Sequence, residues 1–398
     1  MDKFREEFNP EIHPIQKIKG KSDFVRLINY LRLTNISGNI KPIPLKHFTF
    51  YANHLLSPNR FESFEIVKKN GGNRTIHAPK RGLKSILTGL NLFFKQHYKT
   101  HPNVTGFAEG KSIVDNAKPH IGKKYVLNID LKDFFHAFER KHVKWAMMNA
   151  PFFIKEEKEP LAFFIASLCT HPIEINGETK FILPQGSPCS PILTNLLCRR
   201  LDKQLKNLAQ EYQAKYTRYA DDITFSSNHH KISEKDFYNK LEYVISNHNH
   251  QINTKKVRLQ KEGYKQEVTG IIVNEKPNLP KRYIKQLRMW LAYWEKYGYL
   301  KADKLFKNDY LKERGHRIEG TPHLLSVMDG KLQFLKMVKG DKDPTYKKLE
   351  SRFHKLNGDK KLTQAHLELM KINPFKPSLK NQQSLEEVLI KLARKKIL

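Results

Sequence analysis

The distribution of hydrophobic and polar residues predicts an N-terminal helical region followed by a pair of strands. The first 60 or so residues have helical patterning that prolines interrupt. Residues 64–69 and 74–78 read as strands, and the glycine-rich segment 70–73 between them has the composition of a hairpin turn. A helix is predicted from about residue 83 to residue 98.

The central part of the chain combines a strand with helices. Residues 125–130 form a predicted strand that ends at Asp130 and leads into an aromatic-rich segment. The apolar run 161–169 is too short to span a bilayer and predicts a core helix. After Pro191, leucines recur every three to four residues and predict one amphipathic helix; they are Leu193, Leu197, Leu201, Leu205 and Leu208.

Two adjacent carboxylates, Asp221 and Asp222, lie between β-branched and aromatic residues in segment 216–226. This pattern predicts a tight hairpin with both carboxylates at its tip. Because like charges repel, a fold that holds them together usually supplies a cation, and an oxygen-rich divalent-metal site indicates phosphoryl-transfer chemistry. Asp130 completes a set of three carboxylates, enough for two Mg²⁺ ions. The order of elements indicates an α+β fold with these residues on a sheet.

Beyond Pro280 the composition changes to helix formers with many basic residues. Two stripes are predicted on one helix. The first is basic and consists of Lys281, Arg282, Lys285 and Arg288; the second is apolar and consists of Ile284, Leu287, Leu291 and Trp294. The basic stripe is either a contact surface for RNA or an ordinary solvated helix face. Trp290 and Trp294 are expected in the core.

The charge of the chain narrows the class of partner. There are 72 Lys and Arg against 40 Asp and Glu in 398 residues, a net charge of +32. Such an excess favours a polyanionic partner, with nucleic acid as the leading candidate, although charge alone also suits other basic proteins. The three cysteines form no C-x-x-C pair, and the first residues lack the apolar run of a signal peptide. We therefore expect a cytoplasmic protein without membrane association.

Three ordered segments resemble the motifs of reverse transcriptases. The sequence YADD at 219–222 resembles their Tyr-x-Asp-Asp box, and NIDLKDFF at 128–135 resembles their first palm motif. The segment LPQGSPCSPILTN at 183–195 is similar to the box between those two. The resemblance covers roughly residues 60 to 355.

Two shorter elements resemble those of retron reverse transcriptases. NAKPH at 116–120 matches their Asn-Ala-x-x-His element, and VTG at 268–270 matches their Val-Thr-Gly element. A second VTG at 104–106 lies before the first catalytic strand and is taken as coincidental. The resemblance implies a right-hand polymerase. The expected parts are an N-terminal helical segment (1–60), fingers and palm (61–280), a helical RNA-binding thumb (281–345) and a basic C-terminal tail (346–398).

The resemblance also implies roles for individual residues. Asp130, Asp221 and Asp222 would be catalytic and bind two Mg²⁺ ions, with the Leu131 carbonyl as a further ligand. The residues expected around the incoming nucleotide are Lys69 and Arg74 as a triphosphate clamp, Phe135 as a steric gate against the 2′-hydroxyl, and Gln185 and Gly186 at the pocket edge. Contacts to RNA are expected from Asn116, His120 and the basic stripe. For Asn116 and His120 a purely structural role is the alternative, and for Phe135 a place in the core.

By resemblance, the chain is expected to be an RNA-directed DNA polymerase, a nucleotidyltransferase. It would copy part of a cognate structured noncoding RNA into a small single-stranded satellite DNA from dNTPs. Priming from a 2′-hydroxyl of that RNA, an effector protein partner and a role in antiphage defence are expectations from the family alone. The alternatives are another prokaryotic reverse transcriptase, of the group II intron or defence-associated kind, and a catalytically silent RNA-binding scaffold.

Overall fold

A computed structural model describes residues 15, 18–38, 40–68, 71–175, 177–314 and 322–358, with helical backbone alone for 311–314. Within these ranges no helix is long and apolar enough to cross a membrane. The chain divides into two compact units, with the division between Thr269 and Gly270. This division precedes the predicted boundary at residue 280, and each unit is described separately below.

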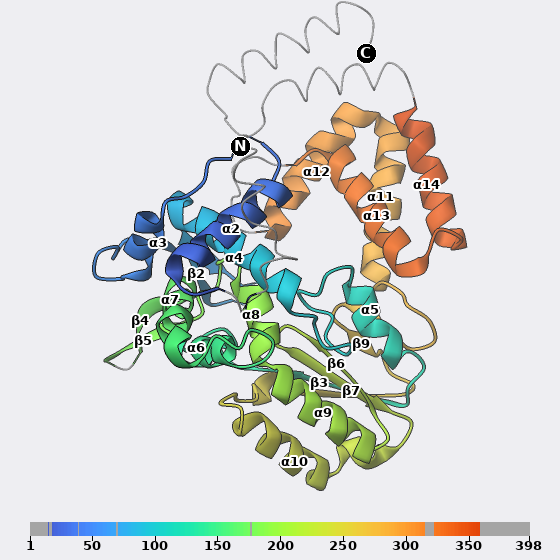
Figure 1. Cartoon of the computed structure of the whole chain (residues 1–398). Coiled ribbons are helices and arrows are strands. Elements are labelled where there is room, and N and C mark those ends of the chain that lie inside the picture. The colour runs from blue at the N-terminus through green and yellow to red at the C-terminus, as the bar shows by residue number, and fades with distance from the viewer. Residues whose placement is uncertain are drawn as a thin grey trace, which may run out of the picture. The chain divides into compact units, whose positions relative to one another are not determined.

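The N-terminal part of the first unit contains an antiparallel strand pair and three helices (Figure 1). Strands β1 (Phe61–Val67) and β2 (Asn73–Pro79) pair along their whole length, and the turn between them includes Gly71 and Gly72, both with positive φ. This confirms the predicted hairpin with slightly longer strands. The helices are α2 (Lys21–Asn35), α3 (Leu45–Ala52) and α4 (Arg81–His97).

The core of this N-terminal part is aromatic and aliphatic. The rings of Phe24 on α2 and Phe93 on α4 meet edge to face, with centroids 5.3 Å apart. Both side chains are fully buried. A side chain at Gly89 of α4 would collide with Ile28 of α2, since an added Cβ would lie 2.6 Å from that residue's Cγ2. The glycine therefore permits the close approach of the two helices.

A four-stranded antiparallel sheet forms the palm. Its strand order is β6 (Lys215–Tyr219), β7 (Asp222–Ser227), β3 (Tyr125–Asp130) and β8 (Arg258–Lys261). Helices α9 (Arg199–Glu211) and α10 (Lys235–Ser246) lie beside this sheet in Figure 1. The predicted strand at 125–130 and the predicted carboxylate hairpin are both confirmed.

Further elements of the first unit connect fingers and palm. Residues 159–169 form the predicted core helix α7, and its apolar side chains are buried except those of Pro160 and Phe163. The others are α5 (Ile113–Ala117), α6 (Arg140–Met148), β4 (His171–Ile175), β5 (Glu178–Ile182), α8 (Ser190–Leu197) and β9 (Glu267–Val268).

The leucine pattern after Pro191 predicts one helix, and this prediction is wrong in its continuity. The structure has two helices, α8 and α9, separated at Cys198. The ψ angle of Cys198 is −2°, which is far from the helical value of about −42° and turns the chain away from one straight axis. The leucines on both sides still face the core, because the two short helices each keep an apolar side.

The second unit is helical. Its main elements are α11 (Lys281–Tyr297), α12 (Tyr299–Arg314), α13 (Leu324–Lys339) and α14 (Pro344–Asn357), preceded by the two-residue strand β10 (Ile271–Ile272). Trp290 and Trp294 on α11 are buried, as the sequence predicts. Of the predicted basic tail, residues 346–357 belong to α14, and residues 359–398 lie outside the described part of the chain.

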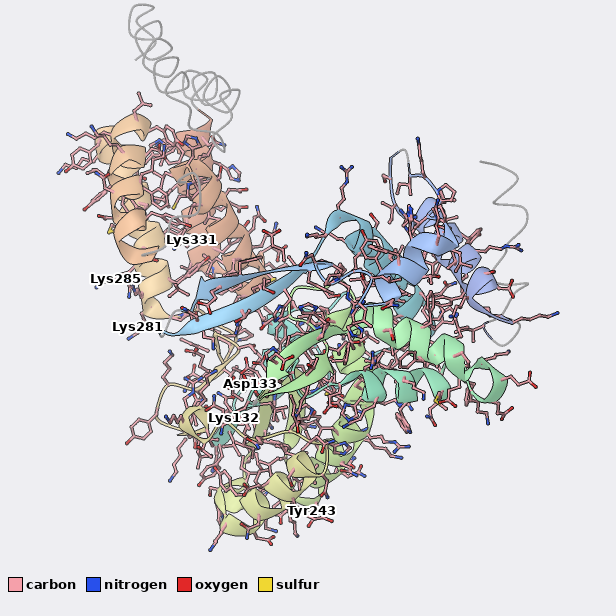
Figure 2. The ribbon with its side chains drawn as sticks, turned by 90° about the vertical axis from the view of Figure 1, so that its left-hand side faces the viewer. Lys132, Asp133, Tyr243, Lys281, Lys285 and Lys331 are labelled. Carbon is pink, nitrogen blue, oxygen red and sulfur yellow. The ribbon has the colours of Figure 1, made fainter. Side chains whose placement is uncertain are left out.

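The two stripes of α11 have different environments. The four basic residues Lys281, Arg282, Lys285 and Arg288 are all exposed. Figure 2 labels Lys281 and Lys285 near the start of this helix. On the other side, Leu287 and Leu291 are fully buried against the remaining helices of the unit.

Candidate active site

The three predicted carboxylates are brought together by strand pairing. Asp130 ends β3 and Asp222 begins β7, and the two residues are directly opposite each other in the antiparallel register. Asp221 lies in the turn before β7, where Ala220 takes a left-handed conformation with φ of +57°. The Leu131 backbone N–H donates to the Asp221 carbonyl over 3.1 Å. The main chain therefore fixes the hairpin tip beside the end of β3.

The carboxylates at the tip share an unfavourable electrostatic environment. Loss of surrounding water raises the pKa of Asp222 to about 6, with further contributions from the negative charges of Asp221 and Asp130, although the residue as a whole keeps contact with solvent. Burial also raises the pKa of Asp221. The positive charges of Lys256 and Arg74 act on Asp221 in the opposite direction. The site is therefore short of positive charge.

Asp130 is held by two residues that the sequence reasoning missed. Its carboxylate accepts a hydrogen bond from Asn253 Nδ2 and an ion-paired one from Lys256 Nζ, each over 3.0 Å. The Asn253 backbone N–H also donates to the Asp130 carbonyl over 2.8 Å. Both residues lie in the segment between α10 and β8, which carries no motif. Only the fold reveals that this segment reaches the catalytic strand.

The oxygens of the three carboxylates are candidate ligands for a divalent metal. Among the described residues, no three His, Cys, Asp or Glu side chains are positioned to hold a metal ion as they stand. Lys256 pairs with one oxygen of Asp130, so a cation would compete with its ammonium group for that carboxylate. The chemistry nevertheless fits: Mg²⁺ prefers carboxylate oxygens, and the pKa of Asp222 is raised by burial and also by neighbouring negative charge that a cation would neutralise.

A fully buried ion pair stabilises the turn of the carboxylate hairpin. Arg218, at the end of β6, donates from Nε and Nη2 to the two oxygens of Asp202 on α9, over 2.7 and 2.8 Å. Its Nη1 donates to the Ala220 carbonyl over 3.0 Å, and Nη2 also reaches Asn195 Oδ1 at 3.3 Å. Tyr216 adds a hydrogen bond to Asp202. All three nitrogens of this guanidinium thus donate hydrogen bonds. One of these bonds is accepted by the turn that carries Asp221.

The first VTG segment, expected to be coincidental, packs against the catalytic turn. The backbone N–H groups of Thr105 and Gly106 point to the Arg218 carbonyl, at 3.0 and 3.5 Å. A Cβ on Gly106 would lie 2.4 Å from the Ala220 nitrogen, so only glycine allows this approach. Asn195 Nδ2 donates to the Gly106 carbonyl over 2.9 Å. The segment therefore has a structural role beside the carboxylate turn.

Asn116 and His120 do not lie at a surface, contrary to their expected contact with RNA. Both side chains are fully buried. His120 forms hydrogen bonds with Ser226 Oγ at 2.6 Å and Thr217 Oγ1 at 2.8 Å, which joins it to strands β7 and β6. Burial lowers the pKa of His120 to about 3, so the ring is neutral at physiological pH. A buried neutral imidazole braces the sheet and is shielded from RNA.

Asn116 joins the two VTG segments. Its Oδ1 accepts from Thr105 Oγ1 over 2.8 Å, and its Nδ2 donates to Thr269 Oγ1 over 3.4 Å. The elements matched separately in the sequence thus form one hydrogen-bonded group behind the catalytic turn. For Asn116, as for His120, the structural alternative fits the observed burial.

Some of the expected nucleotide-binding residues lie close together. The Gln185 carbonyl accepts from the His77 N–H of β2 over 2.7 Å, and Gly186, with φ of +120°, approaches the same strand. Arg74 is exposed on β2, and its charge acts on Asp221. The Gln185–Gly186 loop therefore lies against the strand that carries Arg74. Lys69 lies outside the described residues.

The aromatic doublet that follows β3 is divided between two environments. Phe134 is buried and stacks on His250, with ring centroids 5.6 Å apart. Phe135 is only half-buried, and its ring lies 6.3 Å from that of Phe107. The less buried member of the doublet is thus the one expected to act as steric gate.

Comparison with known proteins places this site in a family. A family model described as "Reverse transcriptase (RNA-dependent DNA polymerase)" matches residues 66–273, which is more than half of the chain. The chain is 34% identical over 242 residues to the retron Mx65 reverse transcriptase of Myxococcus xanthus, covering 58% of this chain and 55% of that protein. It is 30% identical over 266 residues to the retron Mx162 enzyme of the same organism, covering 61% and 54%.

A further relative is covered more fully. The retron Ec86 reverse transcriptase of Escherichia coli is 30% identical over 234 residues, covering 58% of this chain and 68% of that protein. By contrast, the chain spans only about half the length of the two Myxococcus relatives. The matched region contains the carboxylate hairpin, the strand β3 and the segment 183–195. On this evidence the chain belongs to the reverse transcriptases with a right-hand polymerase fold, and within them to the retron type.

Proposed function

We propose that this chain is an RNA-directed DNA polymerase of a retron. It copies part of a cognate structured noncoding RNA into a small single-stranded DNA from dNTPs. The observation that carries the proposal is the pairing of Asp130 with Asp222 at the ends of β3 and β7, beside the Asp221 turn. Priming from a 2′-hydroxyl, an effector protein and a role in antiphage defence belong to the proposal through its retron relatives.

Asp130, Asp221 and Asp222, with the Leu131 carbonyl, would hold two Mg²⁺ ions. When bound, the ions lower the pKa of the attacking hydroxyl and stabilise the departing pyrophosphate. The raised pKa of Asp222 supports this assignment, since the carboxylates repel one another without a cation. Lys256 supplies part of the neutralising charge through its ion pair with Asp130.

The incoming nucleotide would lie between the carboxylates and the fingers hairpin. Arg74 suits the triphosphate because its planar guanidinium can donate two parallel hydrogen bonds to phosphoryl oxygens. Gln185 and Gly186 border the pocket, and the half-buried Phe135 excludes the 2′-hydroxyl. Lys69 is kept as the second member of the triphosphate clamp.

The RNA partner would contact exposed basic residues. Lys281, Arg282, Lys285 and Arg288 form a basic stripe on one side of α11. Lysine and arginine side chains neutralise backbone phosphates and release counterions, so RNA binding is expected to weaken steeply with salt. The net charge of +32 also favours salt-dependent binding of RNA by the chain as a whole.

Primer extension on an RNA template with labelled dNTPs tests the proposed activity. The wild-type chain is expected to make DNA, whereas the variant with Asp221→Ala and Asp222→Ala makes none, because the metal ligands are lost. We expect RNA binding to persist in that variant. Asp133→Asn is a matched control, since Asp133 is an exposed carboxylate next to the same strand (Figure 2).

DNA synthesis that survives the double substitution would refute the assignment of the carboxylates. Loss of synthesis in the Asp133→Asn control to the same degree would show that the effect is not specific to the hairpin. RNA binding without synthesis by the wild-type chain would favour the silent scaffold.

The raised pKa of Asp222 predicts a pH-dependent cost to stability. The pKa of Asp222 rises from its ordinary value of 3.8 to about 6 on folding. The ionisation of Asp222 therefore lowers the free energy of unfolding progressively as the pH rises from about 4, and this loss is complete above about pH 6. Asp222→Asn is therefore expected to raise the melting temperature of metal-free protein at pH 7.5, with a gain that shrinks as the pH falls from 6 to 4. Added Mg²⁺ should raise the melting temperature of the wild type more than that of the variant. Equal Mg²⁺ responses, measured by thermal unfolding, would contradict the metal assignment.

The half-buried position of Phe135 predicts its effect on sugar selection. Phe135→Ala is expected to increase incorporation of ribonucleotides relative to deoxyribonucleotides by at least about tenfold, because space for the 2′-hydroxyl is opened. Single-nucleotide incorporation assays with paired substrates give this ratio. Phe50→Ala, an exposed phenylalanine on α3, serves as control. An unchanged ratio in Phe135→Ala would assign this ring to packing alone.

A further inference from the structure

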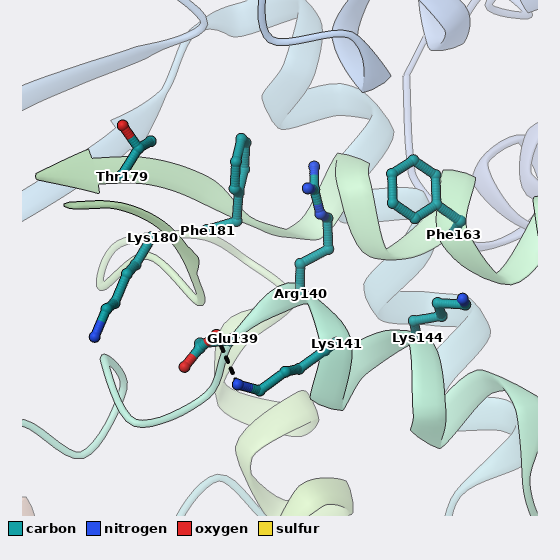
Figure 3. Close-up of a pocket in the computed structure, with 8 residues that line it drawn as sticks. All are labelled: Glu139, Arg140, Lys141, Lys144, Phe163, Thr179, Lys180 and Phe181. Atoms are coloured by element: carbon teal, nitrogen blue, oxygen red, sulfur yellow. Dashed lines mark ion pairs between the residues drawn. The ribbon is translucent and has the colours of Figure 1, made fainter.

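A second basic site lies in the first unit, in a region to which the proposed polymerase mechanism gives no role. A pocket of about 330 Å³ opens between α6, α7 and β5 (Figure 3). This volume lies within the range of small-ligand sites. Its lining has four cations, one carboxylate, one threonine and two phenylalanines: Glu139, Arg140, Lys141, Lys144, Phe163, Thr179, Lys180 and Phe181.

Arg140 is the central group of this pocket. Its guanidinium carbon lies 3.8 Å from the centroid of the Phe181 ring and 4.8 Å from that of Phe163. Figure 3 shows the side chain rising between the two rings. Cation–π contacts of this kind hold a guanidinium in place and leave its N–H groups available for hydrogen bonds to another partner.

Among the described residues, the Arg140 charge has no counter-ion of its own. Across the described ranges, no carboxylate forms an ion pair with it and no acceptor takes a hydrogen bond from it. Partial burial lowers its pKa, with no neighbouring negative charge acting against this effect. A partly buried guanidinium whose N–H donors are not taken by protein acceptors is a favourable binding point for an anion.

The surrounding lysines differ from Arg140 in this respect. Lys141 pairs with Glu139 at 3.1 Å, and Lys144 forms an ion pair with Glu159. Lys180 lies 3.9 Å from Glu178 on the same hairpin. The anion-binding capacity of the pocket therefore centres on Arg140, with the weakly paired Lys180 as the next donor.

An exposed ring completes the site. Phe163 is 46% exposed, which leaves part of an aromatic ring in contact with water beside the guanidinium. A guanidinium beside an exposed aromatic ring suits a nucleotide, because the arginine can bind the phosphate group and the ring can stack on the nucleobase. An acidic protein segment would use the charges but would gain nothing from the ring. The combination favours a nucleotide unit.

We propose that this pocket binds one nucleotide of a single-stranded nucleic acid, with Arg140 and Lys180 on its phosphate and Phe163 against its base. The inference rests on the proposed function, because a template-copying enzyme handles an unpaired strand. Glu156, Glu157 and Glu159 line the neighbouring hollow, which shares Lys144 and Phe163 with the pocket. The strand is therefore expected to avoid that side.

Binding of a fluorescein-labelled uridine 12-mer to the full chain, followed by anisotropy, tests the proposal. Arg140→Gln and Phe163→Ala are each expected to weaken binding about tenfold, consistent with the loss of one stacked or phosphate contact. Arg140→Lys should recover part of the affinity, because it keeps the charge and loses the planar fork. Tyr243→Ala is the matched control: Tyr243 is an exposed aromatic residue on α10 (Figure 2) and should leave binding unchanged.

A 12-mer carrying 5-iodouridine adds a local measurement. Cross-linking is expected on the peptide that contains Phe163 and should be lost in Arg140→Gln, while thermal unfolding confirms that each variant is folded. No cross-link there, or variants that bind like the wild type, would overturn the proposal. Uridine monophosphate that competes as well as the 12-mer would assign the pocket to a free nucleotide, and a glutamate 12-mer that does so would assign it to an acidic protein. Either result would overturn the strand assignment.

The same chains in primer extension separate this inference from the proposed function. A wild type that makes no DNA would contradict the polymerase, while the binding comparison would still decide the pocket. A wild type that makes DNA, with pocket variants that bind the 12-mer equally well, would overturn the pocket alone.

Discussion

The arrangement of this protein depends on holding three carboxylates at one end of a sheet against their mutual repulsion. Pairing of Asp130 with Asp222 and the bond from Leu131 to Asp221 are made by the main chain. The cost appears as the raised pKa of Asp222. The mutual repulsion of the carboxylates therefore favours the binding of a cation at this site.

The buried pair of Arg218 and Asp202 explains how the turn keeps its shape. Removing one partner of such a pair typically costs about 3–5 kcal/mol, because a charge is left buried without compensation. Here the guanidinium also bonds the Ala220 carbonyl, so the buried pair is linked directly to the turn that carries Asp221. Two further residues belong to this group: Asn195 donates to the Gly106 carbonyl, and Gly106 packs against the Ala220 backbone. The residues behind the hairpin therefore act as positioning residues for the carboxylates.

Sequence reasoning succeeded where one local pattern determines one element. The strand at 125–130, the fingers hairpin and the carboxylate turn all follow from alternation and turn composition. It failed where partners are distant in sequence. Asn253 and Lys256 reach Asp130 through folding alone, and the role of Gly106 depends on the backbone of Ala220. Short motifs also misled in part, since Asn116 and His120 are buried among hydroxyl groups of the palm.

The proposed polymerase site is assembled from strand ends, and its proposed template is a cognate RNA. Its most direct test is sequencing of the nucleic acid that copurifies with the chain when it is expressed together with the DNA flanking its gene. The account predicts an RNA covalently joined to a DNA strand that is complementary to part of that RNA. Copurified RNA without any complementary DNA would contradict it.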